Sequence, residues 1–261
     1  MEAAELIVAH IAKWHKKPEP LVIGLCGPQG SGKSTIAERV TIILMDAGLK
    51  VTTLSLDDLY LDRAARALLA AEIHPLFATR GPPGTHDVAL GIAVLDALRS
   101  GEPTCLPRFD KGSDNPHPKS EWPTMADPCD IILFEGWCVG AAPQQDAAQK
   151  EPANALERYD DPEGLWRRAV NAHLLDAYQQ LWARIDRLIL LTAPNFEVVL
   201  RWRREQERSL HARGAPAAMD DDAIARFIQH YERLTRHIAI EMPGRADLVI
   251  ALDANRRMAN R

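Results

Sequence analysis

The chain has 261 residues, of which 46% are hydrophobic and 26% charged, and its formal net charge at pH 7 is −5. This composition is typical of a globular protein with one large α/β domain or two small ones, and the acidic balance argues against nucleic-acid binding. No apolar run approaches the roughly 18 residues of a membrane-spanning helix, and the N-terminus lacks the basic start of a signal peptide, so we expect a cytoplasmic protein without a membrane partner.

Hydrophobic periodicity predicts helices and strands that alternate along the chain. In chain order we expect a helix over residues 2–14, a strand over 21–26, a helix over 34–45, a strand over 51–56, helices over 62–72 and 87–99, strands over 103–106 and 130–134, a helix over 162–183, a strand over 187–191, helices over 195–212 and 220–241, and a strand over 246–252. Such an alternation predicts a three-layer α/β sandwich with a mostly parallel sheet. We expect a single domain over residues 1–261, with an N-terminal helical segment over 1–18 and a polar insertion over 139–163.

Between the first expected strand and the next helix lies the sequence GPQGSGKS, residues 27–34, which matches the phosphate-binding loop G-x-x-x-x-G-K-S. Glycines let backbone N–H groups wrap a polyphosphate, and the helix N-terminus adds donors and a positive dipole end. The motif therefore predicts a P-loop NTPase in which Lys33 reaches the outer phosphates and Ser34 ligates Mg²⁺. The candidate nucleotide contacts are Gly27, Pro28, Gln29, Gly30, Ser31, Gly32, Lys33, Ser34 and Thr35.

The second expected strand ends in SLDDLY, residues 55–60. Ligands of parallel sheets bind beyond the carboxyl ends of the strands, so Asp57 should lie beside the bound nucleotide. A carboxylate there can accept the proton of an acceptor hydroxyl that attacks the γ-phosphate, and Tyr60 is a candidate substrate contact. The competing interpretation is that Asp57 or Asp58 only caps the helical sequence that follows.

Two loops carry cations that suit an anionic substrate. They are RGPPGTHD, residues 80–87, and PRFDK, residues 107–111. Arg80, Arg108 and Lys111 are candidates to bind an anionic group, and His86 is a candidate to orient a substrate hydroxyl. Plain turn chemistry is the alternative for both loops.

The strand expected over 130–134 is followed by Glu135. A carboxylate at this edge of a P-loop protein can hold Mg²⁺ directly or through water, so Ser34 and Glu135 are the candidate metal ligands. Apolar strands that end in an acid are common, and the prediction depends on the neighbouring phosphate-binding loop.

The helix expected over 195–212 carries a cluster of arginines between Arg201 and Arg208. Phosphoryl transfer needs positive charge over the transferring group, so we predict a lid over residues 195–215. Arg203 and Arg208 are the candidates to reach the phosphate. A solvated helix face, paired with Glu205 and Glu207, is the competing interpretation.

These motifs, in this order, resemble the D-glycerate 3-kinases of the plant and fungal type, a group related to phosphoribulokinase, uridine kinase and pantothenate kinase. The motifs that carry the resemblance are GPQGSGKS, SLDDLY, RGPPGTHD, PRFDK, FEGW at 134–137 and WRREQE at 202–207. The resemblance covers about residues 20–255, and its most specific part is the RGPPGTHD loop. It implies ATP- and Mg²⁺-dependent phosphorylation of a small hydroxy acid, with Asp57 as the base. The insertion over 139–163 departs from the pattern of the plant enzymes.

We therefore expect an ATP-dependent kinase for a small anionic metabolite, with D-glycerate, converted to 3-phosphoglycerate, as the first candidate. A kinase for pantothenate or uridine shares the chemistry, but the cationic loops favour a carboxylate, which uridine lacks. A nucleotide-binding regulatory ATPase would need a water-positioning group and nucleotide-sensing segments, whereas the sequence has loops that suit a substrate. No oligomeric state is predicted.

Overall fold

The structure is a computed structural model that describes residues 2–16, 19–212 and 219–259. Parts of two expected segments lie outside the described residues: residues 1 and 17–18 of the N-terminal segment, and residues 213–215 of the lid.

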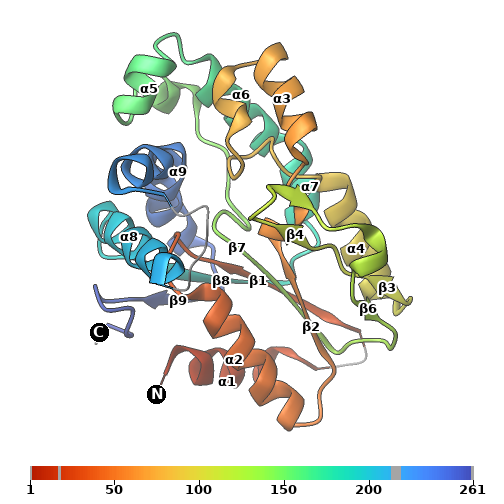
Figure 1. The fold of residues 1–261 in the computed structure, drawn as a ribbon. Coiled ribbons are helices and arrows are strands. Elements are labelled where there is room, and N and C mark those ends of the chain that lie inside the picture. The colour runs from red at the N-terminus through yellow and green to blue at the C-terminus, as the bar shows by residue number, and fades with distance from the viewer. Residues whose placement is uncertain (1, 17–18, 213–218, 260–261) are drawn as a thin grey trace.

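A five-stranded sheet with the order β2-β7-β1-β8-β9 forms the centre of the molecule (Figure 1). Its strands are β1 (Leu21–Cys26), β2 (Val51–Ser55), β7 (Ile131–Gly136), β8 (Arg187–Thr192) and β9 (Leu248–Ala251). Every pairing in this sheet is parallel. All of β7 and nearly all of β1 are buried, as expected for strands covered on both faces. The predicted three-layer α/β sandwich is confirmed.

Helices cover the two faces of this sheet as separate layers (Figure 1). On one face α1 (Ala3–Trp14) and α2 (Lys33–Asp46) pack against strand residues such as Ile23 and Leu25. On the other face α4 (Val88–Ser100) and α7 (Ala177–Trp182) pack against Val22 and Cys26. The apolar residues of β1 thus alternate between two cores, which is the period-two pattern of a strand buried on both faces.

The remaining helices lie toward the carboxyl ends of the strands. They are α3 (Arg63–Glu72), α5 (Ala155–Asp160), α6 (Leu165–Leu175), α8 (Phe196–Ala212) and α9 (Asp221–Glu241). Trp202 of α8 and Tyr231 of α9 are buried in the two main cores. Helices α3, α5 and α6 lie together at the top of Figure 1, over a small separate core that contains Phe77 and Trp166.

Four very short strands form two antiparallel pairs outside the main sheet. They are β3 (Thr104–Cys105) with β6 (Thr124–Met125), and β4 (Phe109–Asp110) with β5 (Asn115–Pro116). The strand expected over 103–106 therefore corresponds to two residues that do not join the parallel sheet. The segment 107–127 contains the β4–β5 hairpin, which contributes to the site.

The prediction of one helix over 162–183 was wrong in one respect, because the segment forms two helices, α6 and α7. Helix α6 ends at Leu175, and Asp176 has φ −102° and ψ −93°, outside the helical region. The break precedes Tyr178, whose hydroxyl accepts a hydrogen bond from the Gly84 amide at 3.0 Å and lies 2.5 Å from His86 Nδ1. Periodicity within the segment does not report these contacts with a distant loop.

The expected polar insertion over 139–163 also needs correction. Val139 and Ala141 are fully buried in the core beside Trp137, so the polar segment begins after them. It then contains a short 3₁₀ turn, Asp146–Gln149, and helix α5.

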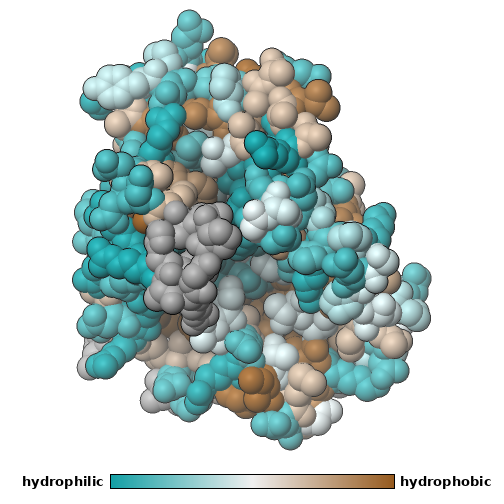
Figure 2. Space-filling view, in the orientation of Figure 1, coloured by the Kyte–Doolittle hydropathy of each residue, from teal (hydrophilic) through white to brown (hydrophobic). Residues whose placement is uncertain are grey.

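None of the helices in the described ranges is both long and apolar enough to cross a membrane. The surface viewed in Figure 2 is mostly hydrophilic, with hydrophobic residues scattered over it. Scattered apolar side chains are normal on a folded domain and do not indicate an interface.

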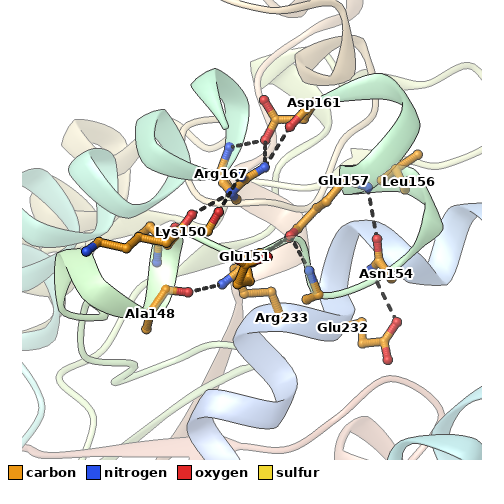
Figure 3. Close-up of polar contacts among 12 residues, drawn as sticks. Ala148, Lys150, Glu151, Asn154, Leu156, Glu157, Asp161, Arg167, Glu232 and Arg233 are labelled. Carbon is orange, nitrogen blue, oxygen red and sulfur yellow. Dashed lines mark hydrogen bonds and ion pairs between the residues drawn. The ribbon is translucent and has the colours of Figure 1, made fainter. Parts of the chain in front are cut away.

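One arginine of α9 joins the insertion to the rest of the fold (Figure 3). The Arg233 guanidinium donates to both oxygens of Glu157, at 2.8 and 2.6 Å, and to the carbonyl oxygens of Ala148 and Glu151, both at 2.5 Å. Glu157 is 0% exposed and accepts a further hydrogen bond from the Ala153 amide at 2.7 Å. This buried ion pair and its hydrogen bonds therefore help to hold the insertion against α9, together with hydrogen bonds such as that from the Leu156 amide to Gln229 Oε1 at 2.8 Å.

Arg233→Met should destabilise the protein by about 3–5 kcal/mol, because it leaves the buried carboxylate of Glu157 without its partner. The matched control is Arg226→Met on the same helix. Its ion pair with Asp160, at 3.0 Å with side chains 56% and 37% exposed, also reaches the insertion side. Because that pair is solvated, the control should lose only about 0–1 kcal/mol. Urea unfolding of both variants measures the difference, and equal losses would contradict the burial argument.

Candidate active site

The phosphate-binding loop adopts a conformation that only glycine accommodates without strain. Gly30 and Gly32 have φ values of +71° and +84°. A Cβ on Gly30 would also lie 2.7 Å from Trp202 Cβ, so the loop passes directly against α8. Gly32 is the N-cap of α2 and supplies no side-chain cap. The first-turn N–H groups of α2 therefore remain available to an anion.

A cavity of about 430 Å³ lies between this loop and the predicted acceptor residues. From the loop, the residues that line it are Gln29, Gly30, Lys33 and Ser34. From the predicted acceptor residues, Asp57, Tyr60, Arg80 and Lys111 line it. Of the other predicted nucleotide contacts, Gly27, Pro28 and Ser31 are buried, Gly32 is half-buried, and Thr35 is exposed in the first turn of α2.

Glu135 stands at the end of β7 with one oxygen engaged and one free of hydrogen bonds. The hydroxyls of Ser34 and Ser55 both donate to Oε1, at 2.9 and 3.0 Å. Oε2 is buried, has no hydrogen-bond partner, and lies 4.0 Å from Lys33 Nζ. A buried carboxylate oxygen beside a serine hydroxyl fits the ligand preference of Mg²⁺.

No group of three or more His, Cys, Asp or Glu side chains that could hold a metal ion was found in the described ranges. Ser55 was not among the predicted site residues. Its hydroxyl reaches Glu135 because the two residues are register partners in neighbouring parallel strands.

Asp57 lines the cavity and both of its oxygens have partners. Tyr60 donates its hydroxyl to Oδ1 at 2.7 Å, and Lys111 donates from Nζ to Oδ2 at 2.5 Å. Burial alone would raise the pKa of Asp57, but the Lys111 and Lys33 ammonium groups and the hydrogen bonds from Lys111 and Tyr60 outweigh it. The pKa of Asp57 therefore lies well below its usual value, and the side chain is a carboxylate at neutral pH.

Neither Asp57 nor Asp58 caps a helix in this segment, because other residues do so. The 3₁₀ turn Leu56–Leu59 is capped by Ser55, which accepts from the Asp57 amide at 3.3 Å, and α3 is capped by Asp62. Asp58 accepts from the Phe109 amide at 3.1 Å and lies 3.4 Å from Arg108. Burial raises the pKa of Asp58, although the Arg108 guanidinium opposes this.

The three predicted anion-binding cations differ in position. Lys111 and Arg80 line the cavity, whereas Arg108 does not and is directed at Asp58 and at the Pro107 carbonyl. Arg80 forms an ion pair with Asp114 and lies over the Phe109 ring, 5.8 Å from its centroid.

His86 lies behind Tyr60 rather than in the cavity. Its Nδ1 is 2.5 Å from the Tyr178 hydroxyl, and its ring centroid is 4.8 Å from that of Tyr60. Burial lowers the pKa of His86 to about 3, so the ring is neutral. Any effect of His86 on an acceptor therefore passes through Tyr60.

The two candidate lid arginines also differ in position, because only one of them lines the cavity. Arg203 lines the cavity, forms an ion pair with Glu207 at 2.6 Å, and lies 5.5 Å from the Phe227 ring centroid. Arg208 is exposed and is not among the lining residues. The competing interpretation of a solvated face thus describes Arg208 better than Arg203.

Sequence reasoning missed the wall that α9 and the FEGW motif contribute. Phe227, Tyr231 and Trp137 all line the cavity. The Tyr231 hydroxyl donates to the Arg80 carbonyl at 2.9 Å, and Trp137 Nε1 donates to the Gly81 carbonyl at 3.0 Å. The i, i+4 spacing of Phe227 and Tyr231 indicates one buried stripe on the helix, but not which cavity that stripe meets.

Comparison with known proteins places this geometry among kinases. The sequence model of the Phosphoribulokinase / Uridine kinase family matches residues 22–141. An uncharacterised kinase of Schizosaccharomyces pombe is 37% identical over 248 residues, which cover 88% of this chain and 87% of the relative. The chloroplastic D-glycerate 3-kinase of Arabidopsis thaliana is 30% identical over 250 residues, covering 90% of this chain but 52% of that protein, so the chain spans about half of its length.

A solved structure is similar over nearly the whole chain. The D-glycerate 3-kinase of Cryptococcus neoformans has a TM-score of 0.79 and 26% sequence identity, covering 98% of this chain and 95% of that one. The similarity therefore extends over the sheet and over helices α8 and α9.

Gly81→Ala should disturb the acceptor side of the cavity. Gly81 has φ +121°, and a Cβ there would lie 2.0 Å from the Tyr231 hydroxyl oxygen. We expect a loss of about 2 kcal/mol or more in the free energy of unfolding, from backbone strain and the displaced tyrosine. Gly244→Ala is the control, because nothing lies within 4 Å of its added Cβ, and it should stay within about 0.5 kcal/mol of the parent. Equal thermal shifts for the two variants would refute the contact.

Stability should fall with acidity because two buried histidines resist protonation. Burial lowers the pKa of His86 to about 3 and that of His230 to about 4, from the usual 6.5. Both folded pKa values are depressed, so their contribution is fully present above pH 6.5 and is lost as the pH falls to about 4 for His230 and to about 3 for His86. The expected slope approaches about 1.4 kcal/mol per pH unit for each histidine. Urea unfolding between pH 7 and 4.5 measures this slope. His230→Gln should reduce it by the contribution of one histidine, up to about 1.4 kcal/mol per pH unit. An unchanged slope would contradict this.

Proposed function

The chain belongs to the phosphoribulokinase and uridine kinase family of P-loop kinases, and on that premise we propose that it transfers the γ-phosphate of ATP to a hydroxyl of a small anionic metabolite, with D-glycerate as the first acceptor. The observation that carries the proposal is the position of Asp57. It lines one cavity with Lys33 and Ser34 of the phosphate-binding loop and with the cations Arg80 and Lys111.

The two halves of this cavity have complementary tasks. Backbone N–H groups of the loop and Lys33 hold the phosphates of ATP, and Arg203 of the lid helix adds charge near the transferring group. Arg80 and Lys111 bind the acceptor carboxylate, which orients a hydroxyl toward Asp57. Asp57 accepts the proton of that hydroxyl as its oxygen attacks the γ-phosphorus.

Ser34 and Glu135 would hold a Mg²⁺ ion, which when bound neutralises charge on the phosphate oxygens. The free Oε2 of Glu135 supports this assignment. Closure of α8 over the nucleotide would keep water from the γ-phosphate. Mg²⁺ dependence, lid closure and a cytoplasmic location stay predictions.

Two observations support D-glycerate over other acceptors. Relatives from Arabidopsis thaliana and Cryptococcus neoformans carry the name D-glycerate 3-kinase. The cavity wall also presents two cations, which suits an acceptor with a carboxylate more than an uncharged nucleoside. Pantothenate shares the carboxylate and is the nearest alternative.

An ATP-consumption assay with D-glycerate, L-glycerate, pantothenate, uridine and glycerol tests the acceptor. We expect turnover with D-glycerate and 3-phosphoglycerate as the product. Turnover with a different acid alone would keep the mechanism and replace the acceptor. Turnover with uridine and none with any acid would overturn the proposed substrate class.

Asp57→Asn should lower kcat by about 10²- to 10⁴-fold, because the amide cannot accept the hydroxyl proton. ATP binding, measured by calorimetry, should stay nearly unchanged, since the phosphate-binding loop is intact. Asp62→Asn is the matched control, because asparagine caps α3 as well as aspartate does and kcat should be unaffected. Near-normal turnover of Asp57→Asn would remove Asp57 from the role of base.

A further inference from the structure

The acceptor side of the cavity is electrically balanced by the protein itself. Lys111 Nζ lies 2.5 Å from Asp57 Oδ2, and Arg80 is paired with Asp114. Both cations that would bind an anionic acceptor therefore already have an acidic partner. One of those partners, Asp57, is the group that we propose as the base.

This contact opposes the task of a base. The ammonium stabilises the carboxylate form of Asp57, so the carboxylate holds a proton poorly while the pair persists. Oδ1 is also engaged, because it accepts the Tyr60 hydroxyl at 2.7 Å. Efficient proton acceptance therefore requires the ammonium to move away from Oδ2 or to be neutralised by another anion.

The position of Lys111 allows such a movement. It directly follows β4 in the turn that joins β4 to β5, and its side chain is 57% exposed. The rest of this hairpin is anchored independently: the buried Arg66 lies 2.6 Å from the Asp114 carboxylate and donates to the Ala78 carbonyl at 2.7 Å. The long, flexible stem of lysine can exchange partners while the hairpin stays in place.

We propose that Lys111 couples the base to the charge of the acceptor: it holds Asp57 in an unreactive ion pair until an acceptor carboxylate draws the ammonium away. The proposal rests on the proposed function and deepens it. Once the base is released, the acceptor oxygen bonds to the γ-phosphorus and its proton passes to Asp57. The bond from phosphorus to the bridging oxygen breaks, and ADP leaves with that electron pair.

The device selects against acceptors that lack a negative charge. Water and neutral alcohols can enter the cavity, but they do not attract the ammonium from Asp57. The ion pair therefore suppresses acceptor-independent ATP hydrolysis even when water is present in the cavity. An acceptor acid acts as substrate and, through its carboxylate, as the signal that releases the base.

The test compares Lys111→Met with Lys119→Met, an exposed lysine of the same 107–127 segment that does not line the cavity. ATP hydrolysis is measured without acceptor, and kcat and KM are measured with D-glycerate and with glycerol, in which a CH₂OH group replaces the carboxylate. Lys111→Met should raise acceptor-independent hydrolysis about tenfold, because the base is no longer paired. It should raise the KM for D-glycerate about ten- to hundredfold and reduce the preference for D-glycerate over glycerol. Lys119→Met should behave as the parent.

A second arm has its main measurement on the unmodified protein, so that this measurement does not depend on the folding of a variant. Propionate carries a carboxylate but no hydroxyl to be phosphorylated. At concentrations that compete with D-glycerate, it should stimulate ATP hydrolysis by the parent protein several-fold but not that of Lys111→Met. Adding Asp57→Asn to Lys111→Met should abolish the raised hydrolysis.

Three outcomes would overturn the proposal. A raised KM with unchanged hydrolysis makes Lys111 only a binding residue, and a parallel fall of all rates with a lower melting temperature makes it only structural. Absence of stimulation by a competing propionate removes the coupling. If no acid is phosphorylated, the proposed function is wrong. The first hydrolysis measurement needs no acceptor, so it still tests the Lys111–Asp57 contact in that case.

Discussion

The site depends on the register of three neighbouring parallel strands, β2, β7 and β1. Ser55 is paired with Glu135, and Cys26 with Gly136, so the strands end at one level. A slip of one residue would move each apolar side chain of β1 from one of the two cores to the other, so the close packing of both cores favours this register. The phosphate-binding loop, Glu135 and Asp57 all leave the sheet at that level, which places their functional groups around one cavity.

The acceptor side is built differently, from segments that are distant along the chain. The loop 80–86, Trp137 and α9 meet there, and the Tyr231 hydroxyl contacts the backbone of Arg80. Tyr231 and Arg233 are two residues apart on α9 and therefore point to roughly opposite sides of the helix. Arg233 binds Glu157 of the insertion (Figure 3). Tyr231 lines the cavity, so the insertion contacts α9 on the side away from the cavity.

The phosphate-binding side and the acceptor side of the cavity share one feature, which is the pairing of their cations with acidic residues. Each cation that lines the cavity has an acidic partner in the part of the chain that the structure describes: Lys33 with Glu135, Arg80 with Asp114, Lys111 with Asp57, and Arg203 with Glu207. If the proposed function holds, phosphate and carboxylate groups of the substrates would enter a site that is already neutralised and would exchange with acids of the protein. Such exchange would make the position of each cation depend on which substrate is bound.

The sequence by itself determined the fold class, the phosphate-binding loop and the strand-end acids. Their signals are local: apolar runs for buried strands, glycines where φ must be positive, and acids directly after strands. It also named Arg80, Lys111 and Arg203, which line the cavity, but it could not separate them from Arg108, His86 and Arg208, which do not. Only the tertiary structure decided which of these residues line the cavity. It alone also decided that the helix breaks at Asp176 and that Tyr231 and Trp137 form part of the cavity wall. Each depends on contacts between residues that are far apart in the chain, and neither the period of a helix nor the composition of a loop records which distant surface it will meet.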